Sequence, residues 1–178
     1  MTSLVIRTIE RITRWAGWLG ALVTVPLIFA MVYEVAVRYV FNSPTFWAYE
    51  LGYMMMGTGL MLGIAYAMQT DSHVRVDFFY HSRSKKGRAV IDLIGYAVLL
   101  PMIVWLCFGL GEYFHRAYVS SEVSGESAWN PVVWPFRIFF FVGFVLFVLQ
   151  TIAEILKSIS LLAGIELAAS ENDGQGIQ

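Results

Sequence analysis

Four long apolar runs limit the folds that this chain can adopt. Between Trp15 and Tyr33, for example, 19 consecutive residues carry no charge. A helix of that length, rising 1.5 Å per residue, comes close to crossing the ~30 Å hydrocarbon layer of a bilayer. We therefore predict an all-α membrane bundle of four transmembrane helices, with approximate bounds at residues 15–40, 47–69, 89–111 and 131–156.

The composition also indicates a membrane protein. Hydrophobic residues make up 58% of the 178 residues and charged residues only 14%, whereas soluble domains carry about 25% charged residues. The single cysteine, Cys107, lies inside an apolar run, so we expect no disulfide framework and no cysteine metal site. No residue spacing indicates catalysis or metal binding, and no nucleotide motif is present. We expect no enzyme activity, no cofactor and no nucleic-acid partner.

The connection between the first two predicted helices carries three charges. Glu34 and Arg38 are four residues apart, so on a helix they share a face, with the acid before the base. A turn at Asn42-Ser43-Pro44 would bring Glu50 back toward Arg38 and place one base between two acids. Charges near a bilayer are normally paired or functional. Glu34, Arg38, Trp47 and Glu50 could therefore form a structural clasp, contact a partner membrane subunit, or serve a transported ion or substrate.

Other segments carry weaker signals. Residues 1–14 predict an amphipathic helix in the membrane interface, with an apolar side of Val5, Ile9, Ile12 and Ala16 opposite three arginines; a solvated basic start is the alternative. In the second helix, Gly59 and Gly63 form a GxxxG pattern that allows close helix packing. The domain organisation is an N-terminal segment (1–14), a four-span domain (15–157) and a cytoplasmic tail (158–178).

The distribution of basic residues predicts the orientation of the bundle. With a cytoplasmic N-terminus, nine bases lie inside and three outside, which satisfies the positive-inside rule. Both termini are then cytoplasmic. The inside bases are Arg7, Arg11, Arg14, Arg75, Arg83, Lys85, Lys86, Arg88 and Lys157, and the outside bases are Arg38, Arg116 and Arg137.

The order of these elements resembles the small membrane subunit (DctQ-like) of TRAP, or tripartite ATP-independent periplasmic, transporters. The resemblance covers about residues 11–157. It rests on Glu34-Val-x-x-Arg38-Tyr39, an Asn/Ser/Pro turn, Trp47-x-x-Glu50, a glycine-rich second span, His73-Val-Arg75-Val-Asp77 before a basic stretch, and Trp134 ahead of an aromatic last span. Many members have a proline just before the glycine aligned with Gly143, where this chain has Phe141-Val142.

This resemblance implies a non-catalytic, multi-pass subunit of the bacterial inner membrane. Such subunits bind a larger membrane subunit that carries the substrate and sodium sites, and a periplasmic binding protein delivers the solute, usually an organic acid. It also implies structural or subunit-contact roles for the four residues of the first connection. His73, Arg75 and Asp77 would anchor a cytoplasmic turn.

A second hypothesis is a membrane anchor of a respiratory enzyme that binds haem or quinone. Membrane b-haems normally take their axial histidines from within the spans. The three histidines, His73, His81 and His115, all lie at or beyond the ends of apolar runs. Their placement therefore argues against this alternative.

Overall fold

Four long helices form the part of the chain that the computed structural model describes, residues 2–70 and 85–163. They are α1 (Thr2–Val40), α2 (Ala48–Gln69), α4 (Lys85–Ser120) and α5 (Trp134–Leu162). Each is long and apolar enough to cross a membrane. The prediction of an all-helical protein with four candidate spans is therefore confirmed.

α4 runs past the predicted span at both ends, and its continuation toward Tyr118 agrees with the four-residue spacing of Glu112 and Arg116, which predicts a pair on a longer helix. The apolar run at 89–111 is embedded in a helix of 36 residues that extends to Ser120. Such a helix is roughly 54 Å long, longer than the hydrocarbon layer, so its ends reach the polar regions. Charged residues limit the apolar run but not the helix, because Glu112 and Arg116 pair one turn apart at 2.5 Å. Similarly, α5 begins three residues and ends six residues later than predicted.

The predicted interfacial helix over residues 1–14 is not confirmed as a separate element. α1 runs without a break from Thr2 into the first span. The side that becomes buried contains Ile6, Thr13 and Ala16. Of these, only Ala16 belongs to the predicted apolar side, whose Val5 and Ile12 are about half exposed. The beginning of α1 therefore packs as a part of the bundle.

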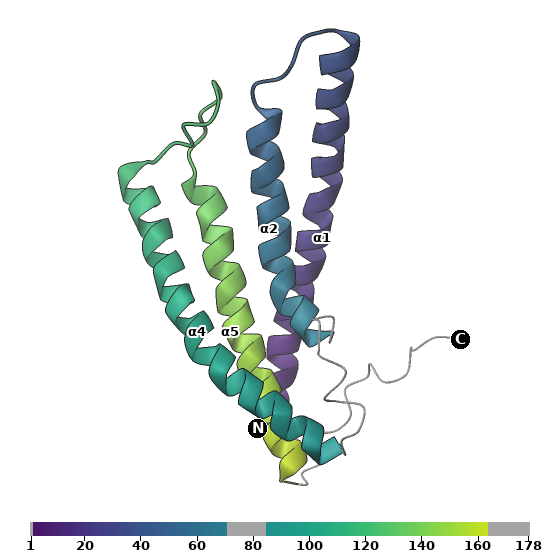
Figure 1. Cartoon of the computed structure of the whole chain (residues 1–178), viewed down its shortest axis with the longest axis vertical. Coiled ribbons are helices and arrows are strands. Elements are labelled where there is room, and N and C mark those ends of the chain that lie inside the picture. Colours follow the sequence, from purple (N-terminus) through teal and green to yellow (C-terminus); the bar gives the residue numbers. More distant parts are fainter. Residues whose placement is uncertain (1, 71–84, 164–178) are drawn as a thin grey trace, which may run out of the picture.

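The helices lie side by side in the order α1, α2, α5, α4 (Figure 1). α1 and α2 form one antiparallel hairpin, α4 and α5 form another, and α2 joins them by packing against α5. α1 also contacts α5, whereas α4 packs chiefly against α5. Both connections between hairpin partners, residues 41–47 and 121–133, lie at the upper end in Figure 1, which we call the loop end. The opposite end is called the terminal end.

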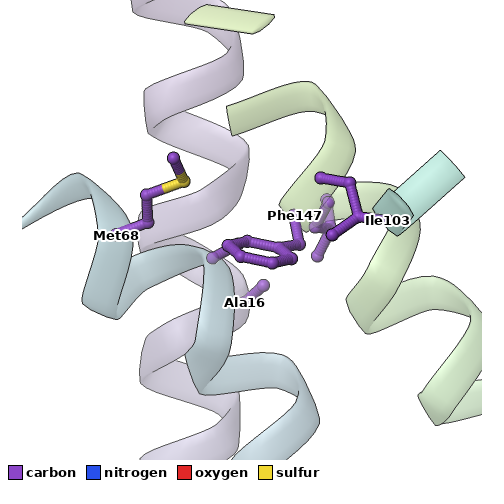
Figure 2. Packing of buried hydrophobic residues seen from close by; sticks show 6 residues of the cluster. Ala16, Met68, Ile103 and Phe147 are labelled. Carbon is purple, nitrogen blue, oxygen red and sulfur yellow. The ribbon is translucent and has the colours of Figure 1, made fainter. Parts of the chain in front are cut away.

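A small apolar core joins the four helices. Figure 2 shows Phe147 of α5 between Met68 of α2 and Ile103 of α4, with Ala16 of α1 close by. Ala65 and Leu146 complete this buried cluster. Because every helix contributes to it, the core fixes how the two hairpins pack together.

Glycines allow the closest helix contacts. A Cβ at Gly20 of α1 would lie 2.8 Å from the backbone oxygen of Gly59 of α2, and one at Gly59 would lie 3.1 Å from that of Gly20. A Cβ at Gly143 of α5 would collide with the backbone carbonyl of Met61. At Gly63, the second glycine of the predicted pattern, a Cβ would meet nothing within 4 Å. The close approaches of one helix backbone to another therefore involve the Gly20–Gly59 pair and Gly143, whereas Gly17, Gly52 and Gly57 are close to side chains.

Gly143→Ala tests this packing. We expect it to destabilise the protein by about 1–3 kcal/mol, because backbone cannot move aside as easily as a side chain. Gly109→Ala is the control, since a Cβ there meets nothing within 4 Å, and alanine favours a helix over glycine by about 1 kcal/mol. Thermal unfolding in detergent compares the two; equal melting temperatures would contradict the assigned close contact.

Candidate functional site

Glu34 connects the end of α1 to the segment that precedes α2. Its side chain is nearly buried, and Arg38 Nε donates to its Oε1 at 2.8 Å while Arg38 Nη2 contacts the same oxygen. The backbone N–H of Thr45 donates to Oε2 at 2.9 Å, and the Thr45 hydroxyl binds there too. Both carboxylate oxygens are therefore occupied, one by the next helical turn and one by the connection.

The first connection is shaped by a short turn. α1 ends at Val40, and the N–H groups of Phe41 and Ser43 both donate to the carbonyl of Val37. Asn42, with φ of 50°, takes the left-handed conformation that asparagine tolerates better than most residues. Trp47 then stacks on Tyr33 with ring centroids 5.9 Å apart. The turn thus brings Trp47 back against α1.

Glu50 lies in a different environment from the one expected. It forms no ion pair with Arg38 in the described chain; instead, the hydroxyl of Ser124 donates to its Oε1 at 2.6 Å. Glu50 is fully buried, and its Oε2 has no hydrogen-bond partner among the described residues. Thr45 occupies the second oxygen of Glu34, and Glu50 faces the other hairpin. The arrangement of one base between two acids is therefore absent at this position.

The connection between α4 and α5 is a compact loop. Val123 and Val132 form an isolated antiparallel bridge, and the N–H of Ser124 donates to the carbonyl of Pro131 at 3.0 Å. The side chain of Asn130 accepts from the N–H of Gly125, whose φ of 70° suits glycine. These contacts close the loop on itself, while the bonds from Ser124 to Glu50 and from Arg137 to Glu122 attach it to α2 and α5.

Arg137 holds this loop to α5. Its Nη1 and Nη2 each donate to one oxygen of Glu122, both at 2.6 Å, and its guanidinium lies 3.6 Å from the centre of the Tyr113 ring. The Arg137 side chain is only 10% exposed. Its hydrogen bonds lower the pKa of Glu122, an effect that partial burial opposes. From the sequence, Arg137 was predicted only to be one of the outside bases. Its place near the start of a span could have indicated an acidic partner, because a charge that leaves water is normally paired.

A second charged cluster, at the terminal end, was also missed. Lys157 Nζ lies 2.5 Å from Oε1 of Glu10 and 2.8 Å from Oε1 of Glu154. Gln150 Nε2 donates to that same Glu154 oxygen at 2.8 Å. This cluster places one base between two acids and ties α1 to α5. Glu10 and Lys157 lie far apart in the chain, so no helical spacing in the sequence relates them. Only the polar character of both segments could have indicated this contact.

The remaining predicted site residues cannot be placed. His73, Arg75 and Asp77 lie outside the described residues, so their anchoring role stays a prediction. Over residues 2–70 and 85–163, no group of three or more His, Cys, Asp or Glu side chains could hold a metal ion. The charged groups of the described site are engaged in tying helices and loops together, and this arrangement suits a structural or contact role.

Comparison with known proteins decides the family. The family model described as "Tripartite ATP-independent periplasmic transporters, DctQ component" matches residues 27–161. The chain belongs to this DctQ family. It is therefore an inner-membrane transport component and not an enzyme. This assignment gives no support to the respiratory-anchor alternative.

Two curated relatives agree with the DctQ assignment. The chain is 27% identical over 160 residues to the sialic acid TRAP transporter small permease protein SiaQ of Vibrio cholerae, covering 86% of this chain and 89% of the relative. It is 24% identical over 117 residues to the sialic acid TRAP transporter permease protein SiaT of Haemophilus influenzae, covering 65% of this chain but only 19% of that protein. No solved structure matches the chain significantly.

Arg137→Ala tests the contact between the α4–α5 loop and α5. We expect a clear fall in melting temperature, because the substitution removes a nearly buried guanidinium with both of its hydrogen bonds. Arg116→Ala serves as the control, because it removes an arginine that is 72% exposed and paired with Glu112 on the same helix. If both substitutions lowered the melting temperature equally, the Arg137 contact would contribute no more to stability than the exposed pair of Arg116.

The pH dependence of Glu122 follows from its lowered pKa. The pairing contributes stability above the ordinary value of 4.5 and loses it as pH falls through the lower folded-state pKa. Above pH 4.5, we expect the wild type to have a higher melting temperature than Glu122→Gln. This difference in melting temperature should shrink at more acidic pH. Melting curves of both proteins across that range measure it. A difference that persists in strong acid would contradict the ionic pairing.

Proposed function

We propose that this protein is the non-catalytic small permease subunit of a TRAP transporter and that it scaffolds a separate large membrane subunit. The observation that carries this proposal is the DctQ family match over residues 27–161. The match to SiaT supports the choice of partner. The segment of SiaT that resembles this chain makes up only 19% of that much longer permease. The large subunit would then supply the transport pathway.

The wider transport reaction belongs to the assembled complex. In this proposal a periplasmic binding protein delivers a small organic acid, and the large subunit couples its uptake to sodium. Both termini of the small subunit face the cytoplasm, so the loop end faces the periplasm. This orientation is supported by the nine inside bases against three outside.

The loop end supports a scaffold role. Glu34 ties α1 to the first connection, while Ser124 links the second connection to Glu50 of α2. These contacts keep both connections in fixed positions at one end of the bundle. With Trp47 stacked on Tyr33, they would present a fixed surface to a partner, and none of the four predicted clasp residues needs to contact the solute.

Co-purification and uptake test the proposed function. The tagged full chain is co-expressed with the large permease, extracted and captured, and the complex is placed in liposomes with the binding protein, a sodium gradient and labelled organic acid. We expect capture of the large subunit, and uptake only when both membrane subunits are present. Uptake by the small chain alone, or a large subunit that is fully active without it, would overturn the proposal.

Arg38→Ala tests the contribution of the Glu34 clasp to assembly. The change leaves the nearly buried Glu34 carboxylate without its countercharge, so we expect less captured large subunit than with wild type. Arg116→Ala is again the matched control, because it breaks an exposed pair with the same four-residue spacing. Equal capture with both variants would contradict a role for this clasp in assembly.

A further inference from the structure

A cavity of about 400 Å³ opens at the loop end between α2, α4, α5 and the second connection. The scaffold role makes no use of it. Its lining combines aromatic rings with a few charged and polar side chains, namely Tyr49, Tyr53, Tyr113, Glu122, Val123, Ser124, Glu126, Val133, Phe136, Arg137 and Phe140. Polar and apolar atoms line this cavity in nearly equal measure, and a cavity of this size that combines apolar contacts with polar groups can hold a small molecule.

The two ends of the cavity differ in polarity. Phe136 contacts the rings of Tyr53 and Phe140, with centroids 5.8 Å and 4.7 Å apart. Phe140 lies one helical turn further from the loop end than Phe136, so this aromatic wall extends toward the apolar part of the bundle. Glu122, Ser124 and Glu126 belong to the loop itself. The cavity is therefore polar at the loop end and apolar toward the middle of the bundle. A bilayer leaflet changes in the same order, from its headgroups to its acyl chains.

The charges around the polar end favour a cation. Arg137 is already neutralised by Glu122, whereas Glu126 forms no ion pair with any described residue. Behind the lining, fully buried Glu50 accepts from Ser124, and its other oxygen has no hydrogen-bond partner within residues 2–70 and 85–163. Tyrosine rings add to this preference, because their faces attract cations. A solute that carries only negative charge would meet Glu126 with no positive group of its own to compensate it, so this cavity does not suit a transported organic acid, whereas a molecule that carries both an ammonium and an anionic group can match both Glu126 and Arg137.

We propose that this cavity binds a phospholipid whose headgroup carries a primary ammonium, of the phosphatidylethanolamine class. The ammonium lies at Glu126, among the tyrosine rings. The phosphate lies beside Arg137, whose guanidinium has five N–H groups and gives two to Glu122. One acyl chain follows Phe136 and Phe140 toward the bilayer interior. This proposal concerns the small chain alone and does not depend on the transport partner.

Native mass spectrometry tests the lipid preference. The full chain is delipidated in detergent and titrated with phosphatidylethanolamine or phosphatidylglycerol of identical acyl chains. We expect the amine lipid to bind about two- to fivefold more tightly, the range of one solvent-accessible ion pair. Equal affinities for the two lipids would overturn the proposal, because the cavity would then recognise the acyl chains and not the headgroup.

A charge-reversal variant makes the test independent of stability. Glu126→Lys places an ammonium at the polar end, so we expect the amine-lipid preference to disappear and phosphatidylglycerol binding to rise. Glu112→Lys is the matched control, since Glu112 is exposed near the same end of α4 but does not line the cavity. Identical effects of the two variants would refute the site.

Discussion

A charged side chain that leaves water requires a partner, and this requirement determines both ends of the bundle. At the loop end, Glu34 and Arg137 each join a helix to a connecting segment, through Thr45 and Glu122 respectively. At the terminal end, Lys157 lies between acids of α1 and α5. Apolar side chains cannot specify such positions in a membrane, since lipid is as apolar as they are. The ion pairs and hydrogen bonds therefore define which segments meet, while the apolar core and the glycine contacts set how closely they approach.

The two ends are constructed differently. The middle of the bundle has a buried cluster of side chains from all four helices around Phe147, and the terminal end adds the charged cluster of Lys157. At the loop end, hydrogen bonds hold the connections onto the helices, and an amphipathic cavity remains between the hairpins. A scaffold benefits from this division, because one end maintains the bundle while the other presents loops of fixed shape to its surroundings.

The sequence predicted the helices well but the pairings only in part. Long apolar runs fix where spans lie, and the four-residue spacing of Glu34 and Arg38 placed these two residues together because it is a local property of one helix. Glu50 faced the other hairpin instead of Arg38, and the Glu122–Arg137 and Glu10–Lys157 pairs were not anticipated. Such contacts depend on how hairpins pack, which one-dimensional periodicity does not encode. The same limit applies to glycine: Gly59 meets α1 closely, whereas Gly63 of the same pattern faces open space.

The side-by-side order of the helices has a consequence for how the protein is handled. In a closed bundle each helix hides one face in a shared interior, but here α4 packs chiefly against α5 and carries large exposed apolar side chains such as Trp105 and Phe108. Solvating molecules therefore supply much of the packing that a globular protein provides for itself. The choice of detergent or nanodisc lipid therefore determines which molecules pack against the exposed face of α4.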